Sequence, residues 1–329
     1  MWPQDTQIKG TGMIEERINR REFIRKGMTT GIALGGGMIW GNLKTVSAKS
    51  PPESQPDLVA VKNHEPDIMF NKAIQMMGGM KRFVKKGQTV VVKPNIGFPK
   101  TPEIGATTNP ILVKSVVEHC YGAGAKKVYV FDNIATSAYG MAQKCYQLSG
   151  IAAAAKDAGA IVAPGDAKKY YHNVDIPHAK VLTSTRVHEL VLESDVFINV
   201  PILKNHGYTR LTMAMKNLMG IVWDRTDYHY SGLDQCIADF CLFKKPDLNV
   251  LDAYRVLLRH GPQGDTPEDV SLQKSLVLST DIVACDAAAA KIYGVEPQKI
   301  KYIKMAHDMG IGNMNLKKVK IGKHIFTRG

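Results

Sequence analysis

Residues 195–207 read Asp-Val-Phe-Ile-Asn-Val-Pro-Ile-Leu-Lys-Asn-His-Gly and give the clearest indication of the fold. Residues 196–198 and 200 are apolar and mostly β-branched, which is typical of a strand that is covered on both faces. Residues 89–92 and 127–131 have the same character. Strands of this kind belong to parallel sheets with helices on both sides, so we expect an α/β fold.

Segments with helical character alternate with these strands. Asn109 is placed to cap a helix that starts at Pro110, and Asp281 to cap one that starts at residue 282. We expect helices over 66–84, 110–121, 140–157, 211–220, 232–242, 282–293 and 297–309, and further strands over 58–61, 160–163, 248–251 and 275–278. The alternation predicts a mainly parallel sheet in a three-layer α/β/α arrangement, with a smaller second lobe as an option.

Two further segments read as antiparallel pairs. Residues 166–190 are irregular and hairpin-like. Residues 318–326 read as a C-terminal hairpin turned at Gly322-Lys323, because apolar and polar residues alternate on either side of a glycine.

The N-terminal residues have the three-part order of a secretory leader. Residues 19–25 read Asn-Arg-Arg-Glu-Phe-Ile-Arg, residues 27–40 are weakly apolar, and Val46-Ser47-Ala48 supplies small residues for cleavage. Paired arginines before phenylalanine are typical of the twin-arginine (Tat) pathway, which exports folded proteins. A cytosolic protein with a basic amphipathic helix and an uncleaved leader that acts as an anchor are the alternatives.

These observations divide the chain into four parts. We predict a signal peptide over 1–48, a linker over 49–56, one domain over 57–310, and a C-terminal hairpin of the same domain over 311–329. The expected location is periplasmic or otherwise extracytoplasmic, with the Tat translocase as a partner during export.

The formal net charge of +13 favours anionic partners such as phosphates or carboxylates. The lysines occur singly or in pairs and do not interleave with aromatic residues, as single-strand binding requires, so we expect no nucleic acid. The five cysteines contain no Cys-x-x-Cys spacing, so an iron–sulfur cluster is not supported. We read them as small buried apolar residues.

Polar residues follow each confident strand. Lys93 and Asn95 come after 89–92, Asp132-Asn133 after 127–131, and Lys204 and His206 after 195–200. Ligands of open α/β sheets bind beyond the carboxyl ends of the strands, so we expect these side chains at one site.

The densest group of such residues lies over 204–229. Its cations and amides fit an anionic ligand, because charge-assisted hydrogen bonds are strong. Imidazoles can act as acid and base near neutral pH or bind a metal, and the sequence does not identify a metal. We assign catalytic roles to Lys204, His206 and His229, and ligand or cofactor binding to Lys93, Asn95, Lys216, Asn217, Arg225 and Asp252. Each of these taken singly could equally be a surface or structural residue.

These motifs together resemble the family catalogued as domain of unknown function 362. The resemblance rests on Val-Val-Lys93-Pro94-Asn95, Ala106-Thr107-Thr108-Asn109-Pro110, Lys204-x-His206, Met215-Lys216-Asn217-x-x-Gly220, Arg225-x-x-x-His229, His260-Gly261-Pro262-x-Gly264 and Ser279-x-Asp281-x-x-x-x-Asp286. It covers roughly 57–310. It also implies a distant likeness to the two-domain α/β architecture of lactate racemase, at the level of fold alone.

The sequence therefore predicts an exported α/β protein with a basic pocket for an anionic organic ligand or cofactor, with proton or electron transfer as the candidate chemistry. The alternative is a non-enzymatic, exported metal- or ligand-binding accessory of a redox complex. That protein would use the histidines with Cys236 and Cys241, and would have a redox partner protein. The identity of the cofactor does not follow from the sequence.

Overall fold

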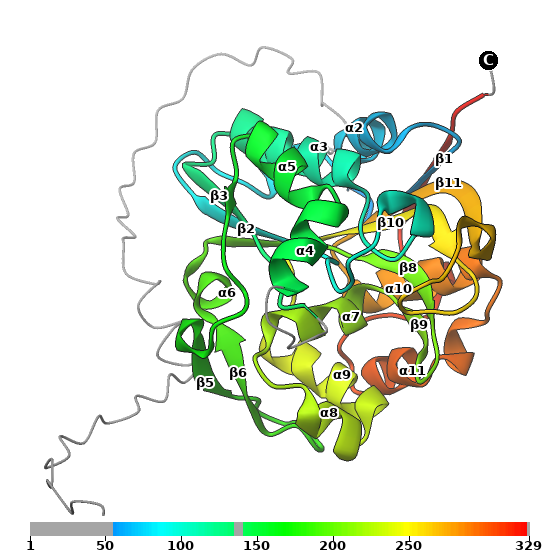
Figure 1. Cartoon of the computed structure of the whole chain (residues 1–329). Helices are drawn as coiled ribbons and strands as arrows, with labels where there is room; N and C mark the ends of the chain where they lie inside the picture. Colours follow the sequence, from blue (N-terminus) through cyan, green and yellow to red (C-terminus); the bar gives the residue numbers. More distant parts are fainter. Residues whose placement is uncertain (1–54, 135–140, 328–329) are drawn as a thin grey trace, which may run out of the picture.

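The computed structural model describes residues 55–134 and 141–327 (Figure 1). The predicted leader and most of the predicted linker lie outside the described residues. No helix within the described ranges is both long enough and apolar enough to cross a bilayer.

One large mixed sheet forms the centre of the molecule. Its order is β12-β1-β11-β10-β7-β2-β3-β4, and β8 and β9 extend it beside β10. Pairing is parallel except for β11 against β1 and β10, and β9 against β8. The strands are β1 Leu58–Lys62, β2 Thr89–Pro94, β3 Lys127–Val130, β4 Ile161–Val162, β7 Val196–Val200, β8 Ile202–His206, β9 Arg210–Thr212, β10 Leu248–Leu257, β11 Val270–Ser279 and β12 Ile321–Ile325. The predicted fold class is confirmed.

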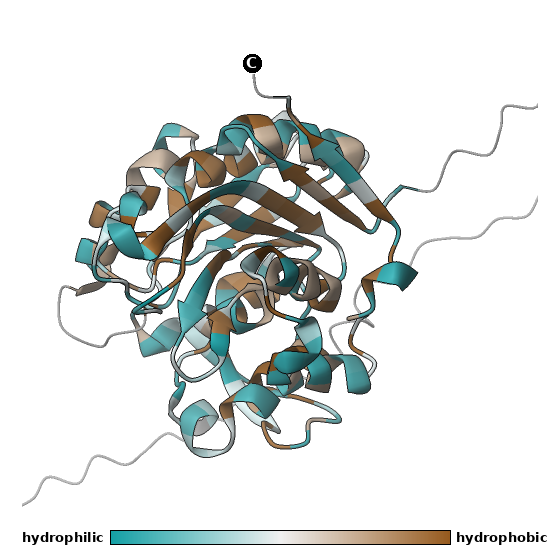
Figure 2. Cartoon of the chain, turned by 90° about the vertical axis from the view of Figure 1, so that its right-hand side faces the viewer, coloured by the Kyte–Doolittle hydropathy of each residue, from teal (hydrophilic) through white to brown (hydrophobic). Residues whose placement is uncertain are grey.

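Helices cover both faces of this sheet, and its strands are largely apolar (Figures 1 and 2). One face packs against α2 Pro66–Met76, α3 Pro110–Gly122, α4 Met141–Leu148 and α5 Ile151–Asp157. The other packs against α6 Glu189–Glu193, α7 Ala214–Asn217, α8 Thr226–Tyr230, α9 Leu233–Phe243, α10 Ile282–Tyr293 and α11 Lys301–Asp308. The two faces bury separate apolar clusters, as the continuous apolar strands predicted.

The predicted hairpin-like segment is an antiparallel pair, β5 Tyr171–Asp175 with β6 Ser184–His188. Val174 and Val187 from this pair belong to the same apolar cluster as Phe197 of β7. The pair therefore shares the core of the main sheet.

Glycines account for two helix boundaries that differ from the prediction. The helix expected over 66–84 ends at Met76, because Gly78 and Gly79 adopt positive φ angles of 96° and 82°. The helix expected over 140–157 is two helices, α4 and α5, separated at Gly150 with φ of 70°.

Two other predictions name the wrong type of element. Residues 210–212 form strand β9, so only α7 and a following 3₁₀ turn, Leu218–Ile221, remain of the helix expected over 211–220. The C-terminal hairpin is also wrong. Strand β12 runs straight through Gly322-Lys323 and pairs in parallel with β1, which places Gly322 opposite Val59. A long-range partner therefore replaces the local turn.

Candidate functional site

A cleft of about 1070 Å³ lies beyond the carboxyl ends of β2, β3 and β8. This is the edge at which ligands of open α/β sheets bind. The structure brings together all the predicted site residues except Asp252. The cleft is lined by Lys93, Asn95, Lys204, His206, Lys216, Asn217, Arg225 and His229.

Lys93 and Asp132 form a buried ion pair at the floor of the cleft. Lys93 Nζ lies 2.8 Å from Asp132 Oδ1, and the side chains are 1% and 3% exposed. Asp132 Oδ2 accepts a hydrogen bond from the Ile96 amide at 2.7 Å. Burial lowers the pKa of Lys93 to about 8, and Asp132 opposes that shift. The sequence correctly predicted that Asp132 lies at the same edge of the sheet as Lys93, but it did not identify Asp132 as the partner of Lys93.

Gly220 packs directly against this pair. A Cβ atom built at this position would lie 1.9 Å from Asp132 Oδ1 and 2.6 Å from Lys93 Nζ. Only a residue without a side chain fits here, which gives a physical reason for glycine in the Lys216-Asn217-x-x-Gly220 segment.

A row of amides crosses the sheet below the cleft. Ser279, Asn249, Asn199 and Lys93 are register neighbours on β11, β10, β7 and β2. Asn249 Nδ2 donates to the Ser279 carbonyl at 3.3 Å, and Asn199 Nδ2 donates to Asn249 Oδ1 at 3.0 Å. Asn217 Nδ2 donates to Asn199 Oδ1 at 2.8 Å.

The row ends at the lysines of the cleft. Because Asn217 Nδ2 is directed at the row, Asn217 Oδ1 faces the cleft, where it accepts from Lys93 Nζ at 3.0 Å and Asn95 Nδ2 at 2.9 Å. Asn95 Oδ1 then accepts from Lys204 Nζ at 3.0 Å. The orientation of each amide is thus determined by its neighbours.

Lys204 is a buried ammonium without a carboxylate in contact. Its Nζ also donates to the Ala106 carbonyl at 2.5 Å and lies 5.1 Å from the centre of the Phe98 ring. Burial and the neighbouring Lys216 lower the pKa of Lys204 to about 7. No carboxylate of the described ranges forms an ion pair with it.

Lys216 reaches the cleft from α7. Asp286 holds the start of this helix by accepting from the Ala214 and Met215 amides at 2.6 and 3.1 Å. Lys216 Nζ contacts Met219 Sδ at 3.4 Å. Burial and Arg225 lower the pKa of Lys216 to about 8.

His206 is held as a neutral imidazole. Its Nδ1 lies 3.2 and 3.4 Å from the Tyr208 and Thr209 amides, which can only donate to it. The proton of the neutral ring is therefore on Nε2. Burial, followed by Lys216 and Lys204, lowers the pKa of His206 to about 3. His206 therefore offers the cleft a donor, and in this tautomer Nε2 is not free to bind a metal.

Arg225 has a different role from the lysines. It donates to the backbone carbonyls of Met219 at 2.9 Å and Ile134 at 3.1 Å, and to that of Asn133. These contacts join the loop after β3 to the segment after α7. The guanidinium thus shapes the wall while adding positive charge.

The mouth of the cleft carries His229 and aromatic side chains. The ring of His229 lies 6.2 Å from that of Tyr208, which in turn lies 6.2 Å from that of His206. Tyr208 is 83% exposed. Burial, Lys216 and Arg225 lower the pKa of His229, so this histidine is also mainly neutral at neutral pH.

Asp252 does not belong to the cleft, and its predicted binding role is wrong. Strand β10 continues to Leu257 and does not end at Leu251, so Asp252 lies within the strand. It accepts from the Asn109 and Tyr254 amides at 2.8 and 2.9 Å, and burial raises its pKa to about 6. Asp252 therefore anchors the loop before α3.

The cysteines of the accessory hypothesis are not at the cleft either. Cys236 and Cys241 are fully buried in the core face of α9. Cys241 Sγ donates to the Ile237 carbonyl, and burial raises the pKa of this thiol. All five cysteines are unbridged and buried, as the sequence predicted. Asp281 caps α10 by accepting from the Val283 and Ala284 amides.

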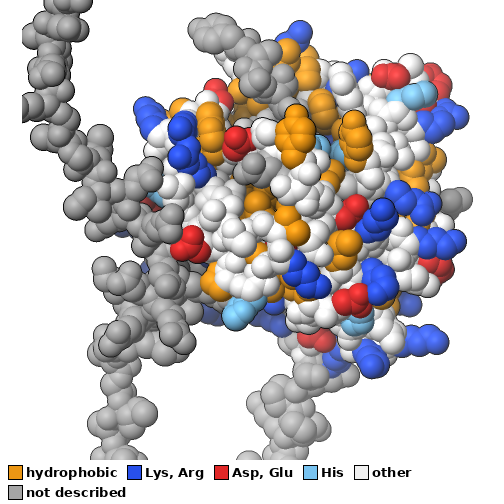
Figure 3. All heavy atoms as spheres, turned by 90° about the horizontal axis from the view of Figure 1, so that it is seen from below, with side chains coloured by type: hydrophobic (Ala, Val, Ile, Leu, Met, Phe, Trp, Pro, Cys, Tyr) orange, Lys and Arg blue, Asp and Glu red, His pale blue; other side chains and the backbone are white. Residues whose placement is uncertain are grey.

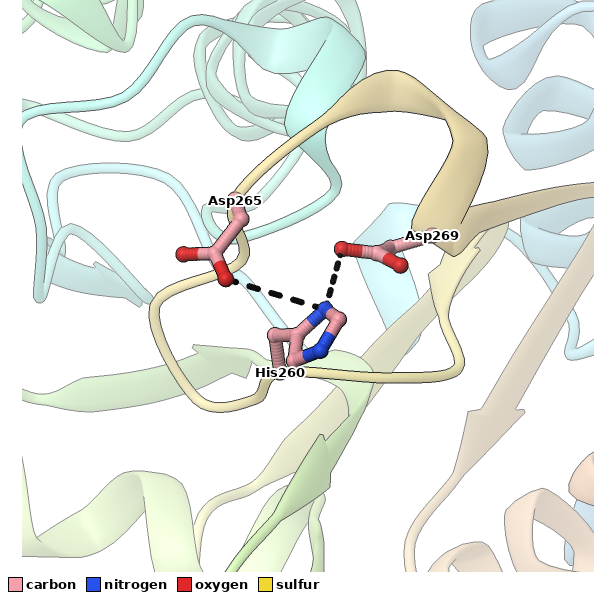
Figure 4. Close-up of side chains that lie close together, drawn as sticks. All are labelled: His260, Asp265 and Asp269. Carbon is pink, nitrogen blue, oxygen red and sulfur yellow. Dashed lines mark hydrogen bonds and ion pairs between the residues drawn. The ribbon is translucent and has the colours of Figure 1, made fainter.

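His260, Asp265 and Asp269 form a second group of titratable side chains on the loop after β10 (Figure 4). His260 Nδ1 lies 2.7 Å from Asp269 Oδ2, and this contact raises the pKa of His260 and lowers that of Asp269. Arg259 Nε donates to the other oxygen of Asp269 at 3.0 Å. Both oxygens of the Asp269 carboxylate thus already have side-chain partners, the His260 ring and the Arg259 guanidinium, and we interpret the group as a brace for the loop.

On the outer surface, the face seen from below mixes basic, acidic and hydrophobic side chains (Figure 3). The cleft is lined by four cations (Lys93, Lys204, Lys216 and Arg225) and by one buried carboxylate, that of Asp132. Asp166 and Asp224, which also line it, are exposed.

Comparison with known proteins gives one family match. The family model described as "Domain of unknown function (DUF362)" matches residues 90–291. This range contains every residue that we place at the cleft.

Individual relatives are distant. The thylakoid-associated protein sll1697 of Synechocystis sp. is 26% identical over 246 residues, which cover 72% of this chain and 73% of that protein. Two solved structures share 11% and 9% identity: the lactate racemase apoprotein of Thermoanaerobacterium thermosaccharolyticum, with a TM-score of 0.46, and a protein of Thermotoga maritima, with a TM-score of 0.43. Each alignment covers 74% of this chain, but only 58% and 59% of the two solved chains.

Proposed function

The chain belongs to the family described as domain of unknown function 362, and we propose that it is an exported protein whose cleft binds a small anionic organic molecule. One observation carries the proposal. Lys204, which is 1% exposed, and Lys216, which is partly buried, bring two ammonium groups to the cleft, and neither forms an ion pair with a carboxylate of the described residues. A buried charge is costly unless it is paired, and a bound anion would supply the missing charge.

The remaining donors favour a carboxylate or phosphate. The neutral Nε2–H of His206 and the ammonium of Lys204 line the same cleft and can donate to oxygen atoms of a ligand. A cleft of about 1070 Å³ has room for a molecule of cofactor size. Proton transfer is the chemistry that fits best, because burial brings lysine pKa values near neutrality.

Export is the second part of the proposal. It rests on Arg20-Arg21, the weakly apolar residues 27–40 and the small residues before Lys49. Replacement of both arginines by lysine should retain the protein in the cytoplasm during cell fractionation. An unchanged distribution would contradict export through the twin-arginine pathway.

Ligand-dependent melting tests the anion site. Glycolate, oxalate and inorganic phosphate are added to the full chain and to Lys204→Met, Lys216→Met and His206→Ala variants. We expect at least one of these anions to raise the melting temperature of the unmodified protein, with a smaller rise in the variants. Lys317→Met, at an exposed lysine outside the cleft, is the matched control. An equal response in all five proteins would refute the site.

The methionine variants also guard against misfolding. Lys216 Nζ contacts only a thioether, so Lys216→Met is expected to leave the free protein as stable as before or more stable, whereas Lys204→Met also removes the donor to Asn95 and Ala106. A lost anion response in a stable variant then reports on binding and not on folding.

A further inference from the structure

Three lysines reach the cleft, and their amino groups have different partners. Lys93 Nζ contacts Asp132 Oδ1 and also donates to the Pro94 carbonyl at 2.7 Å. Lys204 Nζ donates to two oxygens, those of Asn95 and Ala106. Lys216 Nζ has the Met219 thioether as its contact, and no oxygen acceptor within the described parts of the chain.

This difference makes Lys216 the best nucleophile of the three. A thioether is a weak acceptor, so it stabilises an ammonium poorly and leaves the nitrogen lone pair available after deprotonation. Burial also lowers the pKa of Lys216 to about 8, so more of its amine is neutral near pH 7 than that of an ordinary lysine. An amine at the usual lysine pKa would be neutral in less than about a thousandth of molecules.

The position of the amine is also well defined. Lys216 lies on α7, whose first amides are held by Asp286, and Asn217 at the end of the helix is fixed by the amide row. Both of these supporting side chains are almost completely buried. Rigid support of this kind is what a nucleophile requires to meet a bound molecule in a productive geometry.

We propose that Lys216 forms an imine with the carbonyl carbon of a small 2-oxo acid bound in this cleft. The inference rests on the proposed function, because the anion site would hold the carboxylate of that acid. The Nε2–H group of His206 and the ammonium of Lys204 would bind this carboxylate.

The bond changes balance without an oxidant or reductant. The neutral Lys216 amine attacks the carbonyl carbon, a C–N bond forms, and the proton lost from nitrogen is gained by the former carbonyl oxygen. The Lys204 ammonium then gives a proton to this hydroxyl, the C–O bond breaks, and water leaves as the C=N bond forms. The product is a protonated imine on Lys216 beside a neutral Lys204, so the charge on the two lysines is conserved.

Reductive trapping tests the imine. The full-length protein is incubated at neutral pH with glyoxylate and cyanoborohydride, and peptide mass spectrometry locates the resulting carboxymethyl groups. We expect Lys216 to be labelled at least about tenfold faster than the exposed Lys317 in the same sample, because more of its amine is neutral. Glycolate, which has the carboxylate but no carbonyl, should slow the labelling of Lys216 and not that of Lys317.

The variants separate the possible failures. Lys216→Arg keeps the charge and should lose the fast label, whereas Lys204→Arg should keep the label on Lys216 at a reduced rate. Labelling of Lys216 no faster than that of Lys317, or fast labelling of Lys204 in its place, would overturn the imine. If glycolate raises the melting temperature while no fast label forms, the imine is refuted and the anion site stands. If Lys216 is labelled rapidly but glycolate neither slows the labelling nor raises the melting temperature, the anion site itself is refuted.

Discussion

Lys93 Nζ and Asp132 Oδ1 lie 2.8 Å apart at the floor of the cleft, in side chains that are almost completely excluded from solvent. Removal of one member leaves an uncompensated buried charge, so Asp132→Asn is expected to lower the free energy of unfolding by about 3–5 kcal/mol. The double variant Lys93→Met/Asp132→Asn should be more stable than the sum of the single effects predicts. Urea denaturation of the four proteins measures this coupling, and additive single effects would contradict a direct pair.

Gly220→Ala should disrupt the Lys93–Asp132 ion pair by steric overlap. The new methyl group cannot occupy the space of Asp132 Oδ1 and Lys93 Nζ, so we expect a loss of about 2–4 kcal/mol in unfolding free energy. Gly207→Ala is the matched control, because a Cβ atom there meets nothing within 4 Å. The two variants are compared by thermal and urea denaturation. Equal stability of both would mean that the floor of the cleft can rearrange.

Stability and anion affinity should change with pH in opposite directions. Burial lowers the pKa of Lys204 from 10.5 to about 7, so between these values the unfolded chain binds more protons than the folded one. The contribution of Lys204 to the free energy of unfolding of the ligand-free protein therefore rises with pH across this window. Anion binding needs the ammonium, so the affinity for oxalate or glycolate should fall over the same range.

Denaturation and calorimetric titration from about pH 6 to about pH 9 test both trends. In Lys204→Met the rise in stability with pH should be smaller than in the unmodified protein, because Lys204 no longer contributes to it. An affinity that increases with pH would contradict the role of the lysines.

His206 should remain neutral where an ordinary histidine becomes protonated. Burial and the two nearby lysines lower its pKa to about 3, and its Nδ1 accepts from backbone amides. Nitrogen-15 NMR of the ring should show the Nε2–H tautomer unchanged from neutral pH down to about pH 5. His260, whose pKa is raised by Asp269, is the internal comparison and should become protonated within this range. A His206 midpoint near 6.5 would contradict the assignment.

The sequence predicted the parts of the fold whose signals are local. The largely apolar run before Pro201 forms β7, and Asn109 and Asp281 marked the starts of α3 and α10 through capping that the structure contains. The polar residues at the strand ends predicted that Lys93, Lys204 and His206 share one cleft, because parallel strands end at one edge of the sheet.

What the sequence did not predict depends on contacts between distant segments. The parallel pairing of β12 with β1 has no local signal, and Gly322 resembles a turn residue when it is considered alone. Asp252 appeared to follow a strand because the strand was predicted too short. The pairing of Asp132 with Lys93, and the absence of such a partner for Lys216 among the described residues, emerge only when the strands are assembled.

The row of amides below the cleft determines which end of the Asn217 amide faces the lysines, and this orientation begins at Ser279, three strands away. Asn249 can direct its oxygen toward Asn199 because its nitrogen is used by the Ser279 carbonyl on β11. Asn199 and Asn217 are oriented in the same way, each with its nitrogen donating to the preceding amide oxygen. Asn217 therefore presents its oxygen, and not its nitrogen, to Lys93. Ser279 on β11 and Asn249 on β10 do not line the cleft, yet they help to specify which end of an amide the cleft exposes. Asn249→Leu would remove the acceptor that orients Asn199, without altering any residue that lines the cleft.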